Sequence, residues 1–141
     1  MNETLQKVSA TILEEVVKLQ VDIRPANQLH VWLQKRKWLP SSRILEMHPL
    51  TFGTLVKISG VLAKMDIDIL NSKNFLDDYY KVVEKEGEDI ARIIAIAVTN
   101  KKKDPPRRLE RFIINHFRPR DLVNAFTIIQ QQMDVVSFIN S

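Results

Sequence analysis

The sequence lacks cysteine, contains only three glycines and has no long apolar run. Without cysteine, the chain has no disulfide, no thiolate zinc ligand and no cysteine nucleophile, and it fits a reducing, intracellular compartment. Its longest nearly uncharged apolar stretch, residues 93–99, is far too short to span a bilayer. The polar N-terminal residues show none of the features of a signal peptide. We therefore expect a cytoplasmic protein without a membrane segment.

The length and hydrophobic content of the chain indicate one domain. A chain of 141 residues with 45% hydrophobic side chains is large enough to fill a single core. No internal repeat, low-complexity tract or linker divides the sequence. We expect one helical domain that covers residues 1–141.

Apolar residues at helical spacing predict a long first helix over residues 3–24. Proline disfavours helix at the residue that precedes it, so Pro25 ends this element. Steps of three and four residues place the apolar side chains on one face. The residues of this face are Leu5, Val8, Ile12, Val16, Leu19 and Ile23.

Shorter helices are predicted in the middle of the chain. One covers residues 27–37, and another begins after Thr51, whose hydroxyl can accept a free amide of the first turn. We expect the helix after Thr51 to direct its apolar residues, Phe52 and Val56 among them, inward. A fourth helix is expected to begin after Asn71 or Ser72. Between the second and third helices, residues 39–49 predict an extended connector, in which a short strand would have no evident partner.

The second half of the chain predicts further helices separated by glycine and proline. Gly87 is expected to interrupt the chain before residues 90–98, which are apolar on nearly all sides and predict a central buried helix. Pro106 and Pro119 fit the first positions of the last two helices. The predicted fold is all-α, a single-domain bundle or irregular array of six to seven helices with the extended connector at 39–49.

The sequence shows no pattern of catalytic or metal-binding residues. The three histidines, His30, His48 and His116, are isolated, and no pair has the spacing of metal ligands. Residues 66–68 resemble the start of a calcium loop, but residues 70 and 71 do not continue it. The carboxylates of residues 84–89 lie in the most polar part of the chain, where we expect them to be solvated. We therefore expect no enzyme, no cofactor and no metal site.

Two basic segments suggest a binding surface. In the first, residues 35–37 supply three cations between Trp32 and Trp38. Cations contact phosphates and aromatic rings stack on bases, so this combination suits single-stranded nucleic acid. The interpretation we favour is that both indoles pack inside and only the cations are solvated.

The second basic segment, residues 101–120, has eight cations and two acids. Positive charge in the first turn of a helix opposes the helix dipole and costs roughly 0.3–1 kcal/mol at an exposed site. Free amides with arginines at such a position can instead bind an anion, which is a phosphate, a carboxylate of a partner, or an acid of this chain. We expect the turns around Pro106 and Pro119 to form one basic surface. Its candidate residues are Lys101, Lys102, Lys103, Arg107, Arg108, Arg111, Arg118 and Arg120.

One run of residues resembles a known family. Residues 49–59, PLTFGTLVKIS, resemble a pattern in small helical proteins of phage and prophage tail modules, the tail-assembly chaperones. Residues 94–97 and 121–123 are compatible with the same group. The resemblance implies a chaperone that binds a long helical tail protein, the tape-measure protein, before the tail tube forms. No functional residue is carried over, because the run contains no chemistry specific to one function.

The predicted function is a non-enzymatic protein-binding or assembly factor that masks a helical client in a groove between its own helices. The alternative is a nucleic-acid-binding helical module that uses residues 35–37 and 101–120, with an affinity that falls steeply as salt rises. Four aromatic residues are candidates for the client groove: Phe52, Phe75, Tyr79 and Phe138.

Overall fold

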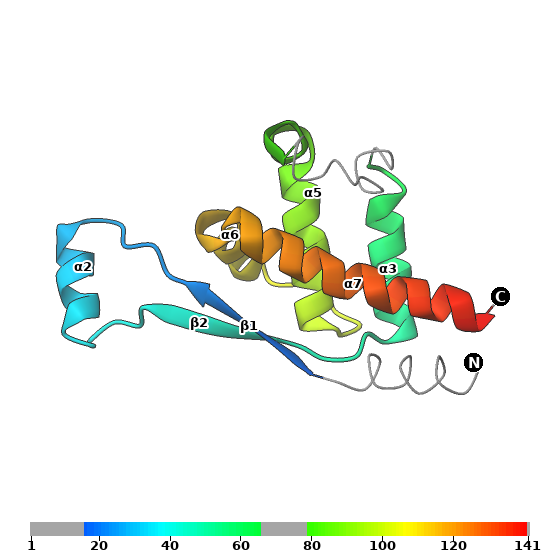
Figure 1. The fold of residues 1–141 in the computed structure, drawn as a ribbon, viewed down its shortest axis with the longest axis horizontal. Coiled ribbons are helices and arrows are strands. Elements are labelled where there is room, and N and C mark those ends of the chain that lie inside the picture. The colour runs from blue at the N-terminus through cyan, green and yellow to red at the C-terminus, as the bar shows by residue number, and fades with distance from the viewer. Residues whose placement is uncertain (1–15, 66–78, 141) are drawn as a thin grey trace.

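The computed structural model describes the backbone of residues 16–65 and 79–140, and the side chains of residues 16–65 and 83–133. Within these ranges the chain forms two strands and five helices (Figure 1). The prediction of an all-α fold with six to seven helices is therefore wrong. The elements are β1 (Val17–Asp22), α2 (Gln28–Lys35), β2 (Ser42–Met47), α3 (Phe52–Leu62), α5 (Tyr79–Thr99), α6 (Arg107–His116) and α7 (Pro119–Asn140).

The largest correction concerns the predicted first helix. Residues 17–22 of the predicted helix form strand β1 instead. Residues 3–15 of that prediction lie outside the described residues. β1 pairs with β2 in an antiparallel sheet whose register runs from Val17 opposite Met47 to Asp22 opposite Ser42. The predicted connector at 39–49 thus contains a strand, and its partner is the segment that we predicted as helix. The predicted helix over 27–37 is confirmed as α2.

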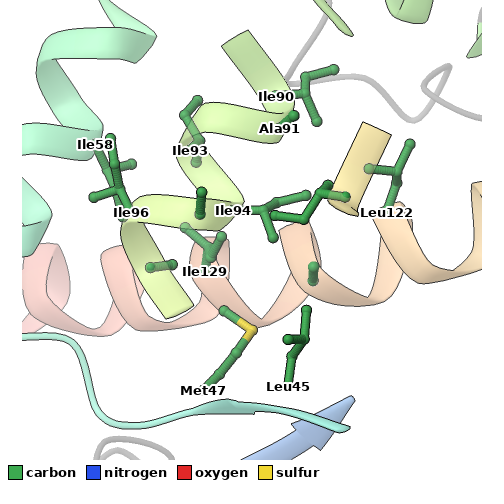
Figure 2. Packing of buried hydrophobic residues seen from close by; sticks show 14 of the residues in the cluster. Leu45, Met47, Ile58, Ile90, Ala91, Ile93, Ile94, Ile96, Leu122 and Ile129 are labelled. Atoms are coloured by element: carbon green, nitrogen blue, oxygen red, sulfur yellow. The ribbon is translucent and has the colours of Figure 1, made fainter. Parts of the chain in front are cut away.

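Helix α5 forms the centre of the core. It packs against α3, α6, α7 and β2, and α7 also packs against β1. Ile93, Ile94, Ala95 and Ala97 of α5 are fully buried, which confirms the prediction of a central buried helix at 90–98. Figure 2 shows Ile93 and Ile94 among apolar side chains of α3, α7 and β2, including Ile58, Ile129 and Met47. The core therefore joins the sheet and the helices into one cluster.

Two predictions about helix details fail. Gly87 does not interrupt the chain, because α5 continues through it from Tyr79 to Thr99. In α3, Phe52 and Val56 are exposed although we expected both to face inward, while Thr54 and Ile58 are buried instead. Thr51 is the predicted N-cap of α3, with its hydroxyl accepting the amide of Thr54 at 3.3 Å. The predicted caps of a fourth helix, residues 71 and 72, lie outside the described residues.

Asn100 joins the end of α5 to the start of α3. Its side-chain oxygen accepts hydrogen bonds from the amide of Thr51 at 3.1 Å and the hydroxyl of Thr54 at 2.7 Å. Its side-chain nitrogen donates to the carbonyl of Pro49 at 2.9 Å. Asn100 has a φ of 47°, in the left-handed region that asparagine tolerates better than most residues. These contacts fix the direction in which the chain leaves β2.

The sheet and α2 together form an arm that projects from the helices (Figure 1). Leu19, Val21, Leu45 and Met47 bury the base of the arm against the core. Helix α2 lies at the far end of the arm, away from α3, α5, α6 and α7. We refer to residues 23–41, which connect the two strands, as the arm tip.

Candidate functional site at the arm tip

Helix α2 at the arm tip buries none of its residues. Trp38 is 67% exposed, Leu29 is 63% exposed, and Trp32 is 42% exposed. Our preferred interpretation, that the two indoles pack inside, is therefore wrong. The physical reason is the position of α2, since the arm carries it away from the core that would have covered its apolar side.

Local hydrogen bonds give the arm tip a defined shape. Asn27 is the N-cap of α2, and its side-chain oxygen accepts the amide of His30 at 2.8 Å. The side-chain amide of Gln34 donates to the carbonyls of Ile23 at 3.2 Å and Pro40 at 3.3 Å. Gln34 thereby ties the helix to both ends of the connection. The exposed apolar side chains are consequently held on an ordered element.

The two tryptophans meet because of the way in which α2 ends. The amide of Trp38 donates to the carbonyl of Leu33, and that of Lys37 donates to the carbonyl of Gln34, both at 3.0 Å. This is a Schellman motif, in which a residue in the left-handed conformation reverses the chain. Lys37 occupies that position with a φ of 62°, where glycine is usual. The reversal places the Trp38 ring 5.3 Å from that of Trp32, edge to face.

The charge of the arm tip and its flanks has one sign. Between residues 23 and 45 the sequence has no acid and five cations, namely Arg24, Lys35, Arg36, Lys37 and Arg43. The guanidinium of Arg36 lies over the Trp32 ring, 5.1 Å from its centre. The arm tip therefore combines an apolar patch with a positive field.

The basic side chains of the predicted segment 101–120 are exposed, but they lie in separate groups. The side chains of Lys101, Lys102 and Lys103 lie in the loop after α5 and are exposed. Lys57 of α3 supports this loop by donating to the carbonyls of Lys101 and Lys102. Its ammonium also lies 3.7 Å from the carboxylate of Asp104. Asp104 is thus directed toward a lysine of α3.

The five predicted arginines occupy the two ends of α6. Arg107, Arg108 and Arg111 lie on its first two turns, whereas Arg118 and Arg120 lie where α7 begins. A helix of ten residues is about 15 Å long, so the two groups are separated rather than joined. Within the described residues, no carboxylate is within ion-pair distance of these arginines. Asp121 instead accepts the backbone amide of Arg118 at 3.0 Å.

The start of α6 borders an open cleft. Pro106 is the N-cap of α6 and offers no side-chain acceptor, so the helix begins one residue later than predicted. The cleft has a volume of about 630 Å3 and lies between β2, the end of α5 and the first turn of α6. Arg43, Lys101 and Arg108 line it together with His48 and Glu46, whose side-chain nitrogen and oxygen are 3.3 Å apart.

The three histidines take different positions. His48 is exposed beside β2, whereas His30 and His116 both accept backbone amides of the turn that begins the arm tip. Burial is the main reason that the pKa of His116 lies below its ordinary value, and the nearby charges of Arg24 and His30 lower it further. Among the residues with described side chains, no group of three or more potential ligands could hold a metal ion.

The predicted client groove receives no support from its aromatic candidates. Phe52 is 78% exposed on the outer side of α3. Phe75 lies outside the described residues, and so do the side chains of Tyr79 and Phe138. Leu29 and Leu39 are further exposed apolar residues of the arm tip, and we did not predict their exposure from the sequence. The acid-free run from 23 to 45 was the signal that could have directed attention to this segment.

Comparison of the chain with models of protein families, with curated protein sequences and with solved structures gave no match. No helix over the described residues is long and apolar enough to cross a bilayer.

Proposed function

We propose that this protein is a non-enzymatic binding factor whose arm tip captures a protein client. The observation that carries the proposal is the exposure of Leu29, Trp32 and Trp38 on an ordered helix that buries none of its own residues. Contiguous exposed apolar patches usually mark binding surfaces. Tryptophan and arginine are also the residues that most often dominate the energy of protein interfaces.

The charge of the arm tip supports a client segment that is both apolar and acidic. The arm tip has four cations and no acid, so it attracts negative charge, while its exposed indoles and leucines gain free energy from apolar contact. Nucleic acid is a poorer fit, because bases stack on free aromatic faces. Arg36 and Trp38 already pack against the Trp32 ring.

The resemblance of residues 49–59 to tail-assembly chaperones supports a particular class of client. A long helical tail protein presents repeated amphipathic segments before it assembles, and a factor that covers them prevents premature association. In this proposal the arm tip recognises the client, and α3, which contains most of the resembling run, lies in the helical body.

Two matched charge reversals test the proposal. One variant carries Lys35→Glu, Arg36→Glu and Lys37→Glu on the arm tip, and its control carries Lys101→Glu, Lys102→Glu and Lys103→Glu on the body. Each changes three consecutive exposed cations. Tagged proteins are used for affinity capture from the native lysate, after nuclease treatment and at high salt. We expect the reversal on the arm tip to lose the client and the control to retain it.

A second pair of variants tests the apolar contribution. Trp38→Ala should weaken client binding by roughly 30-fold, the effect of removing one interface hot spot. Ile114→Ala removes an apolar residue that is 55% exposed on α6 and should leave binding unchanged. Retention of the client by both variants of the arm tip would reject the proposal.

The arginines of α6 form no ion pair with the described carboxylates, and this favours a second candidate, a nucleic-acid-binding module. Arg108 lines the open cleft together with Lys101, and the side chains of Arg107 and Arg111 are exposed on the first two turns of the same helix. Such binding would disappear with nuclease treatment and weaken steeply with salt, because each phosphate contact releases counterions. In a capture without nuclease and at low salt, the Lys101–Lys103 reversal would then be the damaging one.

A further inference from the structure

The turn between β1 and α2 is held by two histidines from different parts of the chain. The amide of Ala26 donates to Nδ1 of His30 at 3.1 Å, within the arm tip. The amide of Arg24 donates to Nδ1 of His116 at 3.0 Å, and His116 belongs to the last turn of α6. Within the described part of the chain, we find no other hydrogen bond between the arm tip and helices α3, α5, α6 and α7.

These hydrogen bonds define the protonation state of both rings. A backbone amide can only donate, so each Nδ1 must carry a lone pair and no proton. The neutral His116 ring therefore carries its proton on Nε2. Protonation of Nδ1 would convert the acceptor into a donor that faces the amide of Arg24, and the contact would become repulsive.

The surroundings of His116 oppose its protonation. Arg24 faces it from the arm tip with a permanent positive charge, and His30 also faces it from the arm tip. Its ring packs 4.8 Å from that of Phe112, and Arg43 of β2 lies over the same Phe112 ring at 4.7 Å. Partial burial and these charges favour the neutral ring at neutral pH.

We propose that His116 and the amide of Arg24 form a histidine latch, which holds the arm tip against α6 at neutral pH and releases it in mild acid. On protonation of His116, the hydrogen bond is lost and two positively charged groups, Arg24 and His116, face each other at the junction. The base of the arm stays in place, because Leu19, Val21, Leu45 and Met47 are buried in the core. The latch is a property of the free protein and does not depend on the client.

Nuclear magnetic resonance of the 15N-labelled full chain tests the latch directly. Between about pH 7.5 and about pH 5, we expect protection of the Arg24 amide from hydrogen exchange, corrected for the intrinsic rate, to fall about fivefold, the value of one net hydrogen bond. The decrease should follow the titration of the His116 ring. Long-range 1H–15N spectra at neutral pH should show the proton of His116 on Nε2.

Three glutamine variants provide the controls. His116→Gln keeps an acceptor that does not titrate, so the Arg24 amide should lose its pH response. His30→Gln should change the pH response of the Ala26 amide. His48→Gln should change the pH response of neither the Ala26 amide nor the Arg24 amide. A proton on Nδ1 of His116 at neutral pH, or an unchanged Arg24 amide while His116 titrates, would overturn the inference. Because no client is present, failure of the proposed function would not alter these results.

Discussion

Single polar residues join segments of this fold that are far apart in the sequence. Asn100 makes three side-chain hydrogen bonds that join α5 to the start of α3, and the hydroxyl of Thr54 that it binds belongs to a buried residue. Gln132 acts similarly in α7, where its buried side chain accepts the amide of Leu50 at 2.8 Å. Both residues satisfy backbone groups at the exit from β2 that would otherwise lack a partner.

Replacement of Asn100 should therefore be costly. We expect Asn100→Ala to lower the free energy of unfolding by roughly 2–4 kcal/mol, because hydrogen bonds are lost near a buried hydroxyl and alanine is strained at positive φ. Asn100→Gly should cost about 1 kcal/mol less, since glycine accepts this φ without strain. Urea unfolding of the two variants measures both effects. Equal losses would show that the backbone conformation contributes nothing.

At the scale of single residues, the sequence predicted the N-cap of α3 correctly, but it did not predict which tryptophan side chains are exposed. The N-cap role of Thr51 could be predicted because it depends on a residue type and its immediate neighbours. The exposure of Trp32 and Trp38 could not, since it depends on how far the arm carries α2 from the core. The side-chain pairing of Asn100 with Thr54 joins residues 46 positions apart and left no local signal.

Among the secondary-structure elements, β1 shows how two periodicities can coincide. Leu19 fits the helical spacing that continues from Val16, and it also fits the alternation of Val17, Leu19 and Val21. The structure follows the alternation, with Leu19 and Val21 buried and Lys18 and Gln20 exposed. The short strand over 42–47 gave no reason to prefer a sheet until its partner was known. Strand pairing depends on residues that are far apart in the sequence, so the pattern of one segment cannot predict it.

The glycines of α3 and α5 should be replaceable, because the fold does not require them. A Cβ at Gly60 would meet nothing within 4 Å, and one at Gly87 would make an ordinary contact with Val83 at 3.7 Å. Neither residue has a positive φ. We expect Gly60→Ala and Gly87→Ala each to raise the free energy of unfolding by about 0.5–1 kcal/mol, the difference in helix propensity.

Thermal and urea unfolding of the two variants check this expectation. Gly53→Ala, in the first turn of α3, serves as a comparison and should raise the free energy of unfolding by less. A loss of stability on Gly60→Ala, together with a change in molecular mass in solution, would show that this side of α3 packs against another molecule.

At the scale of the whole molecule, the described core lies mainly in the sheet and helices α3, α5, α6 and α7. The arm tip contributes none of its residues to this core. The buried apolar cluster contains residues of β1, β2, α3, α5, α6 and α7, and none of α2. The general features of the buried α5 helix and the basic segments followed from the sequence. Their arrangement did not, because the distance between the basic groups of α6 and the projection of the arm are properties of the assembled chain.

Removal of the arm tip should consequently leave the body folded. We propose to replace residues 23–41 with Asn-Gly, which forms a tight hairpin turn between the paired residues Asp22 and Ser42. The variant should unfold cooperatively with a Tm within a few degrees of the wild type, and it should lose the client. Circular dichroism and calorimetry measure the first effect. A broad transition would show that the arm tip contributes to the stability of the body.

The absence of buried side chains in α2 also has an evolutionary consequence. Substitutions at positions such as 29, 32 and 38 change the exposed surface without creating cavities, so folding places little restriction on them. Substitutions at positions such as 93 and 94 remain subject to the packing of the core. The surface at the end of the arm can therefore change by drift among descendants of this chain, while the body that carries it is inherited with little change.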